Sequence, residues 1–224
     1  MQTRIVHWGE TDLVYLYGEG QQGPPGAQLE KLIARCEDAL HASDLSLENA
    51  VFHRLWAKDR KTRDGINEVR ARLLKGKRRT ASSSFISTSH ITSGGTIALE
   101  MIAFRAKAPE TRRLMDFTPA RRYAYYMVQD NWLFLSGMAE EAVTLEVQFD
   151  NALAKVEEAL ERENKSWSRV VEASFFLERG HGSLGWLKDR FRRAVSFQPS
   201  RIIFEEVDGL ASPGKNLEIE VIAM

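Results

Sequence analysis

Hydrophobic positions along this chain follow two periods, one helical and one extended. In the first half, apolar residues three and four positions apart predict an amphipathic helix over residues 27–42 and a shorter one over residues 64–74. Between them, residues 50–57 are rich in β-branched and aromatic side chains and predict a strand. Residues 3–8 and 13–17 predict two strands that form an opening hairpin.

The second half of the chain predicts the same succession of elements. Strands are expected over residues 123–128, 133–135 and 170–177, and helices over residues 149–162 and 184–193. Two more apolar runs close the chain on either side of a Gly/Pro turn, a pattern typical of neighbouring strands in one sheet. These runs are residues 199–204 and 217–223, and the turn is residues 208–214.

The two halves are related by a nearly constant offset in residue number. Four matches carry this inference: Leu32 with Ala152, residues 97–103 with 217–223, residues 13–18 with 133–137, and Arg79 with Arg201. The offsets are 120, 120, 119 and 122, respectively. An offset that persists through separate elements indicates a tandem duplication.

Each half therefore predicts an α+β domain with a mixed sheet and two helices on one face. We place the first domain at residues 1–107 and the second at residues 108–224, with the charged stretch 106–119 as the linker. The opposite sheet faces carry large apolar side chains such as Trp56 and Phe176, which must also be covered. Because another sheet is the expected cover, we expect a homo-oligomer.

Composition and charge remove several classes of function. Lys+Arg and Asp+Glu are equal at 31 each, so the chain as a whole has no electrostatic preference for nucleic acid or an anionic membrane. The first residues lack the layout of a signal peptide, and no apolar run reaches transmembrane length. The single cysteine, Cys36, excludes a framework of intrachain disulfides. We expect a cytoplasmic protein.

Histidine and serine residues give no catalytic or metal-binding signature in the sequence. The five histidines show no metal-ligand spacing and are expected at the surface or in packing. Ser82 has no histidine or aspartate beside it in the sequence that would make it a nucleophile. We therefore expect neither a metal nor a cofactor.

The closing strands carry the most informative chemistry. Because alternate side chains of a strand share a face, Glu218 and Glu220 lie together, and Arg201 opens the preceding strand. A guanidinium and a pair of carboxylates fixed on strands could hold a small carboxylate-bearing molecule beside a proton-transfer group. The plainer interpretation is that Arg201 pairs with Glu218 across the sheet as a structural ion pair.

The combined motifs resemble a known family. The order Leu-Phe-Leu-Ser-Gly, amphipathic helix, Ser-X-X-X-Val-Val, Pro-Ser-Arg and Leu-Glu-Ile-Glu-Val-Ile-Ala is similar to that of the Rid (YjgF-type) reactive-intermediate deaminases, long labelled endoribonuclease L-PSP. The similarity is close over residues 123–224 and looser over residues 1–105. It implies a chorismate-mutase-like fold, trimeric assembly with three-fold or pseudo-three-fold domain packing, and ligand clefts between neighbouring domains. It also implies hydrolysis of small imino or enamino acids to keto acids and ammonia.

The resemblance also implies roles for individual residues. Arg201 matches the family arginine that clamps the substrate carboxylate, and Glu218 matches the glutamate that orients or activates the attacking water. The matched substrate-binding positions are Tyr123, Ser136 and Gly137 in the second half and Arg79 and Asn67 in the first. Ala98 stands where the first half would need the glutamate. Neither half holds the full set, so we expect a composite cleft between unlike halves.

Three functions stay open on the sequence. The first is hydrolysis of an imine or enamine, for which no covalent intermediate is needed. The second is a chorismatase-like pathway enzyme that acts on a larger acid, which the small residues Ala81 and Ala98 favour. The third is a non-catalytic ligand-binding or assembly protein, which Leu187 and Ile203 favour because they occupy positions that are polar or reactive in the family.

Overall fold

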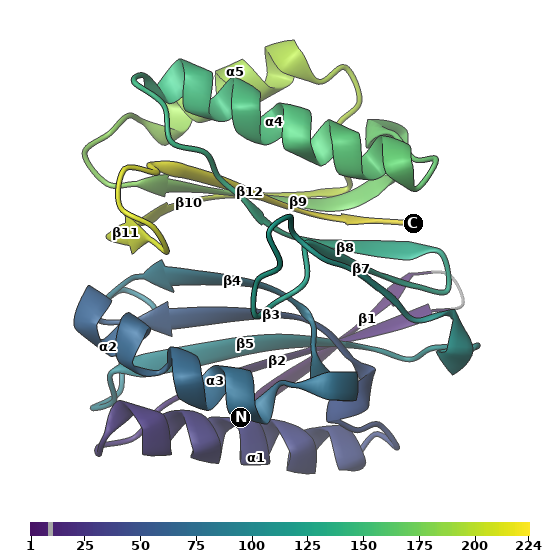
Figure 1. Cartoon of the computed structure of the whole chain (residues 1–224), viewed down its shortest axis with the longest axis vertical. Helices are drawn as coiled ribbons and strands as arrows, with labels where there is room; N and C mark the ends of the chain where they lie inside the picture. Colours follow the sequence, from purple (N-terminus) through teal and green to yellow (C-terminus); the bar gives the residue numbers. More distant parts are fainter. Residues whose placement is uncertain (9–10) are drawn as a thin grey trace. The chain divides into compact units, whose positions relative to one another are not determined.

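The computed structural model describes residues 1–8 and 11–224 and divides the chain into two compact units, Met1–Asp130 and Asn131–Met224 (Figure 1). Each unit is an α+β structure with helices on one face of a sheet. The domain boundary between residues 107 and 108 was predicted from the sequence repeat, and it stays a prediction. Among the described residues, no helix is long and apolar enough to cross a membrane.

The N-terminal unit contains a mixed sheet in the order β1-β2-β5-β3-β4. Its neighbours are antiparallel except β3 and β4, which run parallel. The strands are β1 Gln2–Trp8, β2 Thr11–Glu19, β3 Ala50–Ala57, β4 Ala81–Ile86 and β5 Ile97–Phe104. The predicted opening hairpin and the first central strand are therefore confirmed.

Helix α1, Pro25–His41, packs its apolar side on this sheet and confirms the predicted first helix. A proline in its first turn suits the start of a helix, where the backbone N–H groups have no partner within the helix. The buried cluster combines Leu29, Leu32 and Cys36 of α1 with Leu55 and Leu99 of the sheet. Burial of apolar surface here provides the main stabilisation of the unit.

The second predicted helix of this half is broken in two. The segment forms α2, Arg60–Gly65, and α3, Asn67–Leu73. Asp59 caps α2 by accepting a hydrogen bond from the Thr62 backbone N–H at 2.7 Å. Ile66 lies between the two helices and is completely buried, so the chain changes direction where this side chain enters the core. Periodicity alone does not report such a break.

The C-terminal unit contains four strands in the order β10-β9-β12-β8. They are β8 Trp132–Met138, β9 Val170–Glu178, β10 Arg201–Val207 and β12 Leu217–Ala223. Helices α4, Leu145–Arg162, and α5, Leu184–Ala194, lie on one side of this sheet (Figure 1). The rings of Phe175, Phe191 and Phe204 pack together between α5 and the sheet.

One predicted adjacency in this sheet is wrong. β10 and β12 were expected to be neighbours, but β9 lies between them, parallel to β10 and antiparallel to β12. The intervening turn holds the short strand β11, Gly209–Leu210. A long connection carries the chain across β9, a crossover that sequence spacing cannot distinguish from a hairpin.

The strand registers of the two units confirm the repeat and correct one match. Arg54 of β3 faces Glu100 and Ser83, and Ser174 of β9 faces Glu220 and Ile203, an offset of 120 at all three positions. By the same register, Arg201 corresponds to Ala81. The earlier match of Arg79 to Arg201 is therefore wrong, because Arg79 precedes β4 by two residues.

The offset of 119 in the opening strands has a structural cause. Leu16 of β2 faces Met101, and Leu135 of β8 faces the corresponding Val221. The register of β8 then shifts, so Met138 faces Ile219 and the offset becomes 120. Ser136 and Gly137 together occupy the place of one residue of β2, so β8 contains a β-bulge at this point.

The stretch expected to be a linker is partly structured. It contains the short 3₁₀ helix η3, Pro109–Thr111, and strand β6, Arg113–Met115, which pairs with β7, Tyr126–Gln129. The Asp130 carboxylate accepts hydrogen bonds from Thr111 and from backbone N–H groups of this stretch. Burial opposes the charge of Asp130, but these bonds outweigh it and lower its pKa.

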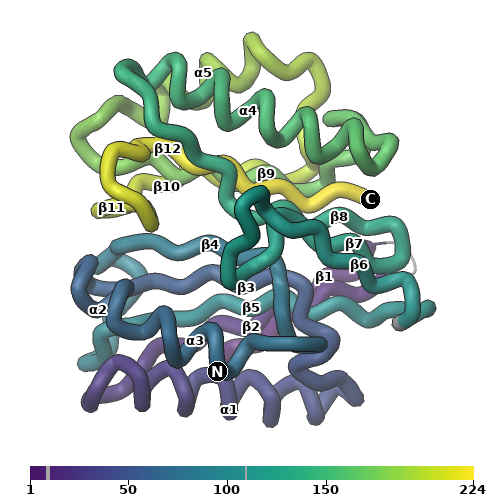
Figure 2. Tube along the Cα trace, viewed as in Figure 1, coloured from purple at the N-terminus to yellow at the C-terminus, as the bar shows by residue number. Residues whose placement is uncertain are grey.

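Residues 116–124 run beside the start of β4, as the teal part of the tube shows (Figure 2). The Ala124 backbone N–H donates to the Thr80 carbonyl at 3.2 Å, and Ala124 forms a parallel bridge with Ala81. This docking brings Tyr123 next to β4 and the helix α3. No periodic feature of the sequence indicates it.

Candidate functional site

A buried polar cluster lies in the N-terminal unit between α3 and the sheet. Its centre is Arg70 of α3, which is only 7% exposed. Nη2 of Arg70 donates to Asn67 Oδ1 at 3.2 Å, and Nη1 lies 3.5 Å from Ser82 Oγ. The guanidinium also lies over the Tyr123 ring, 5.8 Å from the ring centroid.

Arg70 has no carboxylate partner within the part of the chain that the structure describes. Burial is the largest influence on its pKa, followed by the positive charge of Arg63; Tyr123 acts in the opposite direction, and Arg122 lowers the pKa further. Together they lower it from 12.5 to about 10. Arg70 therefore remains charged at neutral pH, although charges are costly to bury without a partner.

His53 of β3 belongs to the same cluster and is buried, which agrees with the packing role expected for a histidine here. Its Nδ1 lies 2.7 Å from Thr80 Oγ1, and its Nε2 lies 3.0 Å from Ser82 Oγ. Burial, and then the charge of Arg70, lower the pKa of His53 well below 6.5. The ring is therefore neutral, with one nitrogen donating and the other accepting.

The structure gives Ser82 the histidine neighbour that the sequence did not indicate. A histidine whose pKa lies far below neutral is a weak general base, because effective bases titrate near the operating pH. We therefore assign Thr80, His53 and Ser82 a structural role as a hydrogen-bonded chain that supports Arg70.

Three of the sequence-predicted binding residues, Asn67, Arg79 and Tyr123, meet around this cluster. Arg79 is bound by the Asp116 carboxylate through both terminal nitrogens and donates to the Arg121 carbonyl at 3.1 Å. A small hollow of about 10 Å³ lies beside Arg79 and Tyr123, large enough for roughly one water. It is lined by His53, Arg70, Ala71, Leu74, Arg79, Thr80, Arg122 and Tyr123.

Sequence reasoning missed Arg70 itself. The available signal was its position three residues after Asn67, a spacing that places two helical side chains together. The helical pattern used for this segment counted only apolar residues, and so it passed over a buried arginine.

The C-terminal unit places Arg201 on the sheet face opposite its helices. Its Nη1 donates to Glu172 Oε2 at 2.8 Å, and the two residues are directly opposed on β10 and β9. The side chain of Glu172 is 3% exposed and that of Arg201 is 38% exposed. The structural ion pair of Arg201 is therefore with Glu172, which sequence reasoning did not identify, rather than with Glu218.

Glu218 lies on the same sheet face but far from Arg201. It faces Phe176, four residues further along β9 than Glu172 and one strand beyond. Strand geometry separates the Arg201 and Glu218 backbones by about 13 Å along the strands and about 10 Å across them. One small molecule cannot contact both side chains of the same sheet.

The predicted Ser136-Gly137 turn is the bulged part of β8, and it meets Glu218. A Cβ atom at Gly137 would lie 1.8 Å from Glu218 Oε1, so only glycine leaves room for this carboxylate. Ser136 is completely buried, as are nearly all of Glu218 and Glu220. The face thus holds three buried glutamates, Glu172, Glu218 and Glu220, around a bulge of the kind often found beside active sites.

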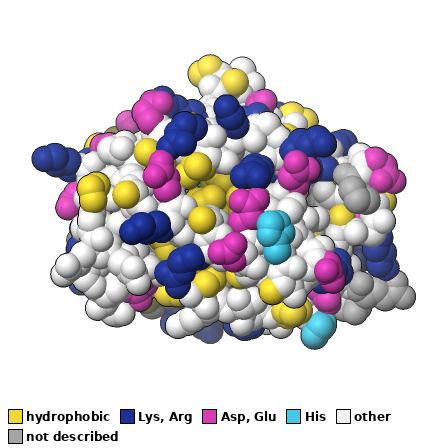
Figure 3. Space-filling view, turned by 90° about the horizontal axis from the view of Figure 1, so that it is seen from below, with side chains coloured by type: hydrophobic (Ala, Val, Ile, Leu, Met, Phe, Trp, Pro, Cys, Tyr) yellow, Lys and Arg dark blue, Asp and Glu magenta, His cyan; other side chains and the backbone are white. Residues whose placement is uncertain are grey.

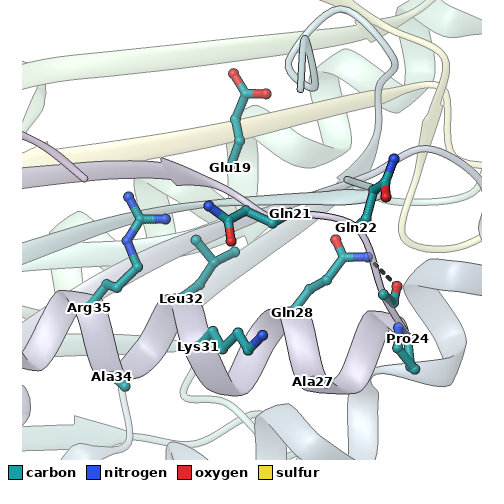
Figure 4. A pocket seen from close by; sticks show the side chains of 12 residues that line it. Glu19, Gln21, Gln22, Pro24, Ala27, Gln28, Lys31, Leu32, Ala34 and Arg35 are labelled. Carbon is teal, nitrogen blue, oxygen red and sulfur yellow. Dashed lines mark hydrogen bonds between the residues drawn. The ribbon is translucent and has the colours of Figure 1, made fainter. Parts of the chain in front are cut away.

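A larger groove of about 350 Å³ runs along α1 in the N-terminal unit (Figure 4). Gln28 forms part of its wall; its amide donates to the Gly23 carbonyl and its oxygen accepts from the Thr96 N–H. Lys31 and Arg35 extend from α1 along the rim. These interactions stabilise the loop before α1, and they do not bring reactive groups together.

Charged side chains are mixed over the surface of the helical side of this unit. Lysine, arginine and acidic residues alternate on the face shown in Figure 3. Two ion pairs join α1 to the segment that follows β3: Glu30 pairs with Arg72, and Glu37 pairs with Arg78. In the part of the chain that the structure describes, no group of three metal-ligating side chains could hold a metal ion.

Comparison with known proteins identifies a family and a solved structure that this chain resembles. Residues 114–224 match the model of the family described as Endoribonuclease L-PSP. A chorismatase structure has 14% identity and a TM-score of 0.60, and the match covers 96% of this chain and 74% of the chorismatase chain. A comparison with curated proteins finds no match.

Smaller relatives match half of the chain. A YjgF-family protein from Mycobacterium tuberculosis has 20% identity and a TM-score of 0.43, covering 50% of this chain and 98% of its own. A Rid-family protein, YyfA from Yersinia pestis, has 18% identity and a TM-score of 0.42, with the same coverages.

The family match and the chorismatase match, with the two sheets of the structure, confirm the predicted class, a tandem of two α+β domains with the chorismate-mutase-like (Rid-type) fold. Residues 114–224 belong to the family described as Endoribonuclease L-PSP, the family that the sequence resemblance names YjgF/Rid.

Proposed function

We propose that the chain hydrolyses small imino or enamino acids to keto acids and ammonia. Water adds to the carbon of the C=N bond, and the resulting carbinolamine releases ammonia to leave C=O. Membership of residues 114–224 in the YjgF/Rid family supports this proposal. The observation that carries it is the accumulation of Arg201, Glu172, Glu218 and Glu220 on one largely buried sheet face, because buried charges weaken a fold unless they serve another purpose.

In this proposal Arg201 fixes the substrate carboxylate. A guanidinium has five N–H donors in a planar fork, and donation from Nη1 to Glu172 holds that fork in one orientation. Its partial exposure leaves the group accessible to a ligand. Glu218, held against Gly137, accepts a proton from the attacking water.

The separation of Arg201 and Glu218 within one sheet limits how the two side chains can act on one substrate. For a small imino acid, the two side chains can serve the same molecule only if they come from two copies of the chain. We therefore propose a homo-oligomer in which Arg201 of one copy and Glu218 of another complete a site.

The test is the decay of 2-iminobutanoate generated in situ, measured for the wild type, Arg201→Ala and Glu218→Gln. Arg192→Ala is the matched control, since Arg192 is an exposed arginine of the same unit that pairs with Asp189 on α5. We expect each site variant to lose about 100-fold in rate, as for removal of a general base or a charge-assisted clamp. No acceleration by the wild type would contradict the proposal.

Co-expression of the two inactive variants tests the shared site. If Arg201 and Glu218 come from different copies, random mixing restores about a quarter of wild-type activity, since half of the copies supply each intact residue. No recovery, with both variants folded and assembled, would show that the two residues do not act on one molecule across copies.

A second candidate is an enzyme that acts on a larger acid. The whole-chain match to a chorismatase favours it, as does the separation of Arg201 from Glu218, which a longer molecule could span. Consumption of chorismate by the wild type, with no effect on 2-iminobutanoate, would select this function over the first.

A further inference from the structure

The N-terminal unit contains a positive charge that its own fold does not balance. Arg70 is more than nine-tenths buried, and in the described residues its side-chain partners are a hydroxyl, an amide oxygen and an aromatic ring. Removing an unpaired charge from water is costly, so the position is favourable only if an anion completes it.

Two more guanidiniums line the same hollow. Arg79 and Arg122 lie at its edge, each bound to an acidic side chain on the outside, Asp116 and Glu68. Thr80 and Tyr123 add oxygen-bearing side chains to the wall. Three arginines therefore line one small hollow, and the acidic partners of two of them, Asp116 and Glu68, do not line it.

We propose that this hollow binds a small oxyanion, the carboxylate or phosphate group of a small molecule, with Arg70 as its counter-charge. Arginine suits both groups because its planar fork matches two of their oxygens. The site lies on the helix side of its sheet, whereas Arg201 lies on the face away from the helices in the other unit. The inference therefore does not depend on the proposed hydrolysis.

Entry of the anion requires an opening of the rim. The hollow now has room for about one water. The side chains of Arg122 and Glu68 are 52% and 80% exposed, so their ion pair is a surface interaction that is easily exchanged for another. To admit an anion, Arg122 turns from Glu68 towards it, which widens the hollow.

The experiment is thermal unfolding and titration calorimetry with inorganic phosphate and, separately, with 2-oxobutanoate, at constant ionic strength kept with chloride. We expect at least one probe to bind saturably and to raise the Tm by about 5–10 °C at 100 times its Kd. The probe that binds more tightly identifies the class of ligand.

Arg70→Met keeps an unbranched side chain that can pack in the same place and removes its charge. It should abolish the ligand-dependent rise in Tm, and its own Tm should equal or exceed that of the unliganded wild type, since an unpaired buried charge has been lost. Arg72→Met, two residues along the same helix and paired with Glu30 at the surface, should retain the full rise. Arg122→Gln should weaken binding about tenfold by removing one charge-assisted partner.

Saturable binding that is lost in Arg70→Met and kept in Arg72→Met establishes the site. Absence of a saturable shift with both probes, or an equal shift in wild type and Arg70→Met, overturns the proposal.

Discussion

The two units share one backbone plan but distribute their charges differently. In the N-terminal sheet, Arg54 faces Glu100 and bonds to it at 2.7 Å, so the two charges compensate each other. At the corresponding rows of the C-terminal sheet, Ser174 faces Glu220, and the acids Glu172 and Glu218 take the places of Phe52 and Ala98. The face of the N-terminal sheet thus pairs a positive with a negative charge, whereas the face of the C-terminal sheet carries more acidic than basic side chains.

On the helices, the uncompensated charge lies in the N-terminal unit instead. Arg190 of α5 corresponds to Arg70 by the offset of 120 but lies at the surface, where Asp150 accepts from it at 2.7 Å. Arg70 is buried without such a partner. The comparison teaches that a duplicated fold can keep the register of its central strands while the positions that carry its chemistry move from one face to another.

The sharpest test of this division is a pair of arginine variants. Arg201→Ala should reduce imine hydrolysis about 100-fold, because a carboxylate clamp supplies charge-assisted hydrogen bonds that nothing else replaces. Arg79→Ala should leave the rate within about threefold, since Arg79 bonds Asp116 outside the sheet face. Rates would be measured under identical imine supply. Equal, complete loss in both variants would remove the distinction between the units.

Substitution of the bulge glycine should have the next largest effect. Gly137→Ala places a methyl group on the Glu218 carboxylate and should cost about 1–3 kcal/mol of unfolding free energy as well as activity. Gly185→Ala, where a Cβ finds its nearest neighbour at 3.7 Å, is the control. Because Gly185 lies in α5, this control should be neutral or stabilising by up to about 1 kcal/mol. Urea unfolding of the two variants measures the difference.

The buried histidine predicts a pH dependence specific to the N-terminal unit. The folded-state pKa of His53 is lowered, so the unfolded chain binds the proton first as the pH falls below 6.5. Stability is therefore complete above that pH and falls by about 1.4 kcal/mol per pH unit below it. His53→Gln should remove this part of the slope between pH 6.5 and 5.5. An unchanged slope would mean that His53 is not the group responsible.

The smallest expected effect concerns a helix cap. Thr144 accepts from the Val147 N–H at 3.3 Å at the start of α4, whereas α1 begins at prolines without a side-chain cap. Thr144→Ala should lower the unfolding free energy by about 1 kcal/mol, and Thr144→Ser should restore most of it. Chemical denaturation with a probe in the C-terminal unit, such as Trp186, would report this change.

Periodicity was sufficient for the long elements and insufficient for the short ones. α1 and α4 were predictable because each has an apolar face several turns long. The break at Ile66 and the strand β6 depend on tertiary packing that leaves little trace in local sequence. The crossing of the chain over β9 was misread as a hairpin for the same reason.

The candidate site was predictable only in part. The family motif identified Arg201 and Glu218, and their roles stay predictions. Glu172 and His53 could not be found, because each acquires its partner from a strand or segment far away in the sequence. Arg70 was missed although its partner Asn67 lies only three residues away, because the helical pattern counted apolar residues alone. The hypothesis of a single composite cleft likewise stays a prediction.

The bulge in β8 has an evolutionary consequence. Ser136 and Gly137 take the place of a single residue of β2, a difference of one codon between the two copies. Divergence between the copies at this strand thus needed an insertion or a deletion and not a gradual remodelling of the backbone. A chain shortened by Gly137 would recreate the geometry of the other copy, and it would close the space in which the Glu218 carboxylate now rests.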